Sequence, residues 1–166
     1  MAKVVGSILV LVDGTEQSVT AAQYAILVAK ATGAQLAAIY VINTRALHDL
    51  VKARIFLQAE QDEYQLDLEA DAERYLNHVR ELAGRKGVAI ETVKTSGTVH
   101  QEVRNEVAKR KVDLLVLGEL GGVRSRRDEF YDEAERALRS VPCSVVVVKD
   151  EDRVWGLYEA APDAPR

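Results

Sequence analysis

The stretch VDLLVLGELGGVRSRRDEFYDEAERALRSVPCSVVVVK, residues 112–149, determines the fold and poses the main functional question. Its apolar start, residues 112–117, predicts a parallel strand that is covered on both faces. Glycines between a strand and a helix let the backbone turn tightly and approach a ligand, and three follow at once: Gly118, Gly121 and Gly122. Three cations stand beside this turn: Arg124, Arg126 and Arg127. The pattern up to this point indicates a phosphate site.

The residues that follow the arginines argue against a phosphate. Five carboxylates crowd the start of the next helix: Asp128, Glu129, Asp132, Glu133 and Glu135. We interpret them as groups that satisfy the amides and the dipole of their own helix N-terminus, rather than as a metal site. The Pro142-Cys143 break then leads into a second buried strand, from Ser144 to Lys149.

Size and composition restrict the class of protein. The chain has 166 residues, 48% of them hydrophobic and 29% charged, which fits a single globular domain with one core. The net charge of -4 gives no basic excess that would favour nucleic acid. No apolar run approaches the ~20 residues of a membrane span, and the N-terminus resembles a first strand more than a signal peptide. With a single cysteine, Cys143, we expect a cytoplasmic protein.

The rest of the chain alternates strands and helices. Apolar runs predict strands at residues 7–12 and 36–42, and residues 88–95 alternate as an edge strand does. Helical spacing covers residues 17–32, 56–85 and 99–111, and the longest of these helices carries a core stripe that includes Tyr64, Leu68 and Tyr75. The alternation predicts a five-stranded parallel, doubly wound sheet in a three-layer α/β/α sandwich. Ligands of such sheets bind at the carboxyl ends of the strands, where the candidates are Asp13, Val41 and the loop from Gly118.

The chain divides into a domain of residues 1–149 and a tail of residues 150–166. The tail is polar and ends in Pro162 and Pro165, so we expect it to be mobile. It also contains an apolar group that is able to dock on the domain: Val154, Trp155, Leu157 and Tyr158.

Four segments together resemble the universal stress protein family. They are ILVLVDGTEQS, IYVIN, VDLLVLGELGG and VPCSVVVVK, and the resemblance runs from Val4 to Lys149. It implies a flavodoxin-like fold of the adenine nucleotide alpha hydrolase type. It also implies a homodimer paired through the last strand, Ser144 to Lys149. An open apolar edge strand is an aggregation hazard, which pairing with a second copy would remove.

One branch of that family binds ATP through the pattern G-x2-G-x9-G-[ST]. Gly118 and Gly121 match the first half, but Tyr131 and Asp132 stand where the pattern has Gly and Ser or Thr. Glu133 also replaces a residue that is usually small or apolar. A carboxylate only accepts hydrogen bonds, and like charges ~4 Å apart repel by roughly 1 to 4 kcal/mol. We therefore expect no productive ATP binding and no bound cofactor.

The adenosine half of the site is better preserved. Asp13 and Val41 match positions that lie near the adenine in ATP-binding relatives, and the three arginines could attract a smaller anion. Asp13 is equally compatible with capping of the following helix. Two hypotheses result: a homodimeric, non-enzymatic stress-response regulator, or a nucleotide-binding module for ATP, AMP or cyclic AMP with at most weak hydrolysis.

The remaining reactive side chains have structural interpretations. Cys143 lies at the start of a buried strand and has no assignable catalytic partner, so we interpret it as a structural thiol. His48, His78 and His100 fall in different elements without metal-ligand spacing, which favours surface or packing roles and no metal.

Overall fold

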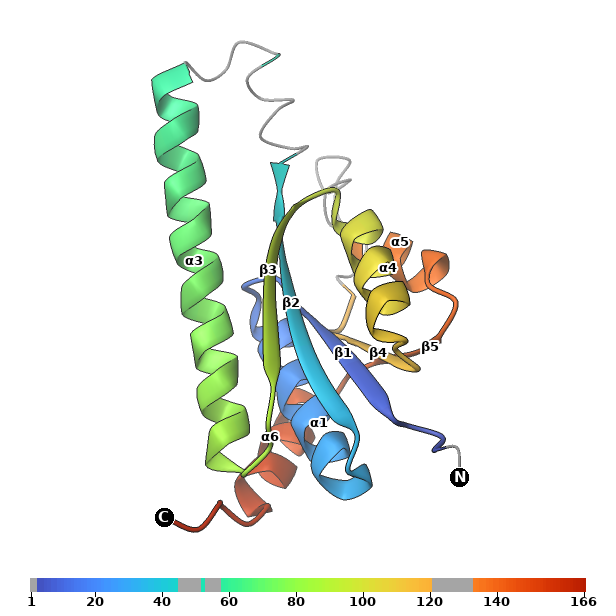
Figure 1. The fold of residues 1–166 in the computed structure, drawn as a ribbon. Coiled ribbons are helices and arrows are strands. Elements are labelled where there is room, and N and C mark those ends of the chain that lie inside the picture. Colours follow the sequence, from blue (N-terminus) through green and yellow to red (C-terminus); the bar gives the residue numbers. More distant parts are fainter. Residues whose placement is uncertain (1–2, 45–51, 53–57, 121–132) are drawn as a thin grey trace.

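The core of the protein is a parallel sheet with the strand order β3-β2-β1-β4-β5 (Figure 1). A computed structural model describes residues 3–44, 52, 58–120 and 133–166. Every neighbouring pair of strands is parallel, which confirms the predicted five-stranded, doubly wound sheet. The strands are β1 (Ser7–Val12), β2 (Gln35–Asn43), β3 (Glu91–Gly97), β4 (Leu114–Leu117) and β5 (Ser144–Val147).

Two helical layers cover the sheet because successive strand side chains point to opposite faces. Ile8, Val10 and Val12 of β1 pack with the helices α1 (Glu16–Thr32), α3 (Gln58–Arg85) and α6 (Glu151–Ala160). Leu9 and Leu11 pack on the other face with α4 (Val99–Arg110) and α5 (Glu133–Ser140). The two clusters give the three-layer sandwich expected from the sequence.

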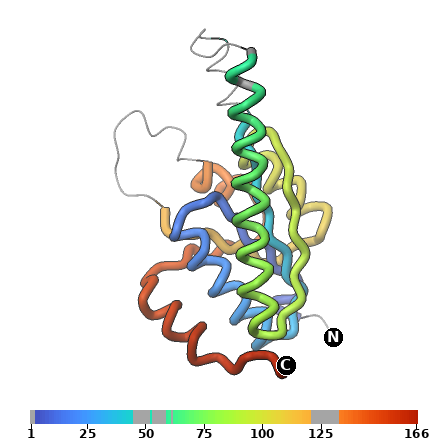
Figure 2. Tube along the Cα trace, turned by 90° about the vertical axis from the view of Figure 1, so that its left-hand side faces the viewer, coloured from blue at the N-terminus to red at the C-terminus, as the bar shows by residue number. Residues whose placement is uncertain are grey.

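Helix α3 is longer than the sheet that it covers. Its later turns are buried at Ala72, Leu76 and Val79, whereas Tyr64 in its earlier part is 43% exposed. Figures 1 and 2 show the start of α3 rising beyond the sheet. The predicted core role of Tyr64 is therefore wrong: the helical spacing is right, but none of the described strands extends beneath this part of the helix.

The tail is not the mobile segment that its polarity suggested. Asp150 accepts a hydrogen bond from the Arg153 amide and begins α6, which packs against α1. Val154 and Tyr158, four residues apart, are both buried in the core cluster of α1 and α3. The apolar group does dock, through these two residues, while Trp155 and Leu157 stay exposed. Two buried positions are too few to give a clear helical pattern in a polar sequence.

Within the described ranges, no helix is both long enough and apolar enough to cross a membrane.

Candidate functional site

The carboxyl ends of β1, β2 and β4 form the candidate site. Because these strands are adjacent and parallel, the residues that follow β1 and β4 lie at one edge of the sheet. The structure therefore brings Asp13 and Gly118 to the same end, as the sequence predicted, with Val41 near the end of β2.

Asp13 organises the turn into α1. Its Oδ1 accepts hydrogen bonds from the Thr15 amide at 3.0 Å and from the Thr15 hydroxyl at 2.6 Å. Thr15 in turn caps α1, because its Oγ1 accepts from the Ser18 amide. The Asp13 amide donates to the Ser18 hydroxyl oxygen, which closes the turn. Asp13 thus supports the helix start, and its carboxylate remains exposed at the edge of the sheet.

Gly118 has a packing role that the glycine pattern did not reveal. A Cβ at this position would lie 2.6 Å from the Gln17 carbonyl oxygen and 2.9 Å from the Ser18 nitrogen, both of them backbone atoms. The end of β4 therefore packs directly against the first turn of α1. Only glycine permits this approach without a shift of one of the two backbones.

Val41 is a buried residue near the end of β2. Its side chain packs into the core cluster that faces α4 and α5, and its backbone lies opposite Thr95 of β3. The backbone of β2 at this position is therefore fixed on a buried strand, which is how a protein holds a main-chain group for recognition.

An aromatic pair that the sequence analysis did not assign to the site lies beside Asp13. The rings of Tyr40 and Tyr75 stack with their centroids 6.4 Å apart, and both lie against Gly14. Burial raises the pKa of the Tyr40 hydroxyl, and the negative charges of Asp13 and Asp71 raise it further. The two tyrosines are separated by 35 positions, so no local pattern could have found the pair.

Glu133 joins the starts of α4 and α5. Its Oε2 accepts a hydrogen bond from the His100 amide at 3.1 Å and lies 2.8 Å from Nδ1 of the same residue. His100 is in the first turn of α4, where Thr98 makes no side-chain cap. The Glu133 carboxylate thus caps α4 from the start of α5, a contact that the sequence analysis did not predict, and it also lies in the first turn of its own helix.

The environment of Glu133 favours its ionised form. Burial alone would raise the pKa of this carboxyl, but the hydrogen bonds from the His100 ring and amide, with the attraction of Arg136, lower it below its ordinary value. A fixed negative charge therefore stands between the starts of α4 and α5. His100 was predicted to have a packing role rather than a metal role, and the residues that the structure describes contain no group of metal-ligating side chains.

Six predicted site residues lie outside the described residues: Gly121, Arg124, Arg126, Arg127, Tyr131 and Asp132. The described part of the site consists of Asp13, Val41, Gly118 and Glu133, with Tyr40, Tyr75 and His100 added by the structure.

The fold and the position of this site define an α/β protein of the nucleotide-binding-like class. The universal stress protein family model matches residues 5–149. A curated relative, Universal stress protein MJ0531 of Methanocaldococcus jannaschii, is 31% identical over 144 residues, which cover 86% of this chain and 81% of the relative. The chain therefore belongs to the universal stress protein family.

Solved structures show the same fold at low sequence identity. A universal stress protein from Burkholderia pseudomallei has a TM-score of 0.69 at 19% identity, over 90% of this chain and all of that one. An Arabidopsis thaliana family member with AMP bound has a TM-score of 0.62 at 13% identity, covering 89% and 94% of the two chains. A universal stress protein in complex with cAMP has a TM-score of 0.58 at 18% identity, covering 87% and 96%.

Proposed function

We propose that this protein is a homodimeric, non-enzymatic regulator of the universal stress type that does not bind ATP productively. The observation that carries the proposal is the sequence after the first two motif glycines. Tyr131 and Asp132 replace the Gly-[ST] pair, so a ring and a carboxylate stand where outer phosphates need a bare backbone and a hydroxyl donor.

The contacts of Glu133 support the same conclusion. Its carboxylate follows directly after Asp132 and caps α4 through His100, so the amide that it occupies is not available to a phosphate. The lowered pKa of Glu133 keeps this negative charge in place at neutral pH. Outer phosphates at this helix start would meet a fixed like charge, which is unfavourable at short range.

The alternative function is binding of a smaller nucleotide, which would depend on the adenosine half of the site. Asp13 keeps its carboxylate exposed at the edge of the sheet, and Val41 holds a fixed strand backbone nearby. Related structures contain AMP and cAMP. Binding of these two nucleotides should therefore be compared with binding of ATP.

A thermal-shift titration tests the proposal. A ligand that binds only the folded state stabilises it by RT ln(1 + [L]/Kd), so affinity is converted into a shift of the melting temperature. We expect no shift with micromolar ATP. A rise of several degrees with ATP would contradict the proposal, and a rise with AMP or cyclic AMP alone would assign the adenosine half-site.

The proposed homodimer forms through β5. This strand is the outer strand of the sheet and pairs with β4 alone among the described strands. Its Val145 and Val146 pack into opposite core clusters, so its two faces are covered, and no described strand pairs with its outer edge. We expect a dimer in sedimentation analysis at tens of micromolar, and a monomer at that concentration would contradict this part of the proposal. Together with the single cysteine, the proposal places the protein in the cytoplasm.

A further inference from the structure

The structure contains a cavity at the amino end of the sheet, far along the strands from Asp13 and Gly118. Its volume is about 630 Å³, within the usual range of small-molecule pockets. It is bounded by the starts of β1 and β2, the end of α1 and the segment that joins α3 to β3. None of the described residues of the candidate site lines it.

The cavity arises because β2 begins before its outer neighbour does. Pairing of β2 with β3 starts at Ala37 and Glu91, so Gln35 and Leu36 precede the first paired residue. The chain that leads into β3, residues 88–90, lies on the other side of the gap and lines the cavity. The opening is thus a feature of the sheet itself and not of a surface loop.

Much of the cavity wall is apolar. Ile8 and Leu36 of the strands are buried, and Val88 and Ile90 are half-buried on the opposite wall. Small side chains complete this lining: Ala29, Ala34, Ala37 and Ala89. A ligand with an apolar body would remove this surface from water, at about 25 cal/mol per Å².

The charged lining is mainly positive. Lys30, Lys86 and Arg110 face one carboxylate, Glu91, so the lining carries 3 - 1 = +2 formal charges at neutral pH. Two of the cations are already neutralised. Arg110 binds Glu91 at 2.7 Å and Glu106 at 2.9 Å, and Lys86 binds Asp163 of the tail.

Lys86 is bound by the tail. It is only 3% exposed, and its Nζ donates to the Ala161 carbonyl and the Asp163 carboxylate, both at 2.7 Å. The same ammonium lies 4.7 Å from the centre of the Tyr158 ring. Lys86 therefore holds the tail against the cavity wall, and its charge is already paired with the Asp163 carboxylate.

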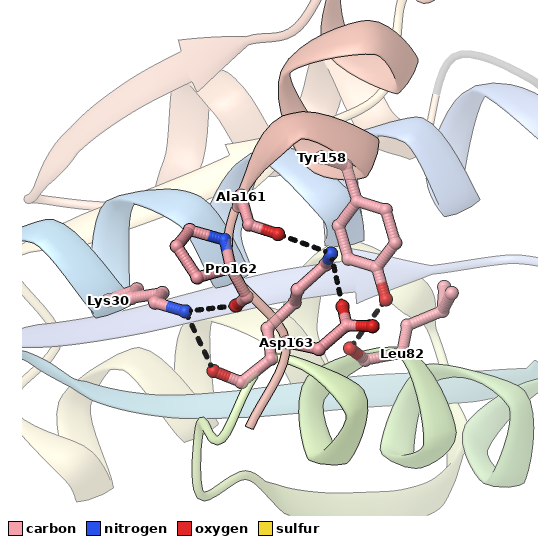
Figure 3. A network of polar contacts seen from close by, with 7 residues as sticks. Lys30, Leu82, Tyr158, Ala161, Pro162 and Asp163 are labelled. Carbon is pink, nitrogen blue, oxygen red and sulfur yellow. Dashed lines mark hydrogen bonds and ion pairs between the residues drawn. The ribbon is translucent and has the colours of Figure 1, made fainter. Parts of the chain in front are cut away.

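Lys30 differs from the other two cations. Its Nζ donates to the Lys86 carbonyl at 3.2 Å and to the Pro162 carbonyl at 2.6 Å (Figure 3). Among the described residues it forms no ion pair within 4.0 Å, in contrast to Lys86 and Arg110. An ammonium has three N–H donors, so these two bonds to carbonyls leave one donor at the rim of an apolar cavity, on a cation that no described carboxylate contacts directly.

We propose that this amino-end cavity is a second binding site, which takes a small organic carboxylate with an apolar body and anchors it through Lys30. The apolar chain fills the space between Leu36 and Ile90, and the carboxylate accepts the remaining hydrogen bond of the Lys30 ammonium. The tail fixes Lys30 at the rim through the Pro162 carbonyl. This site lies beyond the proposed function, because it shares no residue with the nucleotide half-site.

Calorimetric titration of the full chain with decanoate tests the proposal. We expect saturable binding of one decanoate per chain. Lys30→Gln keeps a polar side chain with N–H donors and removes the charge, and it should weaken binding about tenfold, as expected for loss of a charge-assisted hydrogen bond. Lys109→Gln is the matched control, since Lys109 is exposed in the last turn of α4 and does not line the cavity.

Further titrations distinguish binding at this site from nonspecific adsorption and from binding at the nucleotide half-site. Decyltrimethylammonium, with the same chain and the opposite charge, should not bind, and Ala89→Trp should abolish decanoate binding by filling the cavity. Saturating AMP should leave decanoate binding unchanged. The proposal is overturned by absence of wild-type binding, by an unchanged affinity in Lys30→Gln, by equal binding of the cationic probe, or by competition with AMP. None of these results depends on whether ATP binds.

Discussion

Charged groups at each end of the sheet show how the chain supplies its own partners. At the carboxyl end, the Asp13 carboxylate is bound by Thr15 and the Glu133 carboxylate by His100. At the amino end, the Lys86 ammonium is bound by Asp163 and by the carbonyl of Ala161. Helix N-termini favour anions and helix C-termini favour cations, so the placement of these groups follows from the winding of the fold.

The difference between the ends lies in how far apart the partners are in the chain. Asp13 and Thr15 are two positions apart and belong to a recognisable turn. Lys86 and Asp163 are 77 positions apart, and no sequence motif contains both of them. A functional interpretation based on motifs therefore concentrates on the carboxyl end, although the amino end contains the cavity and the buried cation.

The substitution with the largest expected effect on stability is at the amino end. Tyr158 is fully buried, and its hydroxyl donates to the Leu82 carbonyl at 2.7 Å. Tyr158→Ala should lower the free energy of unfolding by about 4 kcal/mol, as truncation of a buried aromatic does. Urea unfolding measures this loss.

Tyr158→Phe is the matched control for that variant. It keeps the ring and removes one hydrogen bond, so it should cost about 1 kcal/mol. If Tyr158→Ala costs no more than Tyr158→Phe, the tail is not part of the core and the comparison of the two ends fails.

The second effect is at the carboxyl end. Gly118→Ala should lower the free energy of unfolding by about 2 to 3 kcal/mol, because the new methyl group meets the backbone of Gln17 and Ser18. Gly84→Ala, in α3, is the control: a Cβ there meets nothing within 4 Å, and alanine should stabilise the helix by about 0.5 to 1 kcal/mol. If Gly118→Ala is as stable as the wild type, the hydrogen-only side chain of Gly118 is not required for packing against α1.

The fold was predictable because it rests on local patterns. The apolar runs of β1, β2 and β4 predicted buried strands, and their alternation with helices predicted the parallel order. The predicted edge strand at residues 88–95 is shifted, since β3 spans Glu91–Gly97 and its first expected residues line the cavity instead. A periodicity of two does not reveal where the neighbouring strand begins.

The site was predictable only in part. Asp13 was found from its turn, and its bond to Thr15 shows a structural contribution while its ligand role stays a prediction. The contact of Glu133 with α4 was not predicted, because its partner His100 is 33 positions away. The stacking of Tyr40 on Tyr75 depends on how α3 crosses β2, which no sequence pattern specifies.

A substitution with a smaller expected effect on stability tests whether Glu133 caps α4. Glu133→Gln should lower the free energy of unfolding at pH 7 by about 1 kcal/mol, the usual cost of a lost helix cap. The folded pKa of Glu133 is lowered, so its contribution is present above the ordinary pKa of 4.5 and is lost as the pH falls through the folded value.

Urea unfolding across the acidic range measures this dependence. Wild type and Glu133→Gln should converge in stability as the pH falls below 4.5. A constant difference between them down to pH 3 would show that the ionised carboxylate is not what stabilises α4.

The central claim is that Tyr131 and Asp132 close the site to the outer phosphates of ATP. Calorimetric titration with ATP of the wild type and of the double variant Tyr131→Gly with Asp132→Ser tests it most directly. The account predicts no ATP binding by the wild type at micromolar concentration and measurable binding by the double variant. Micromolar ATP binding by the wild type, at an affinity that the two substitutions leave unchanged, would contradict it.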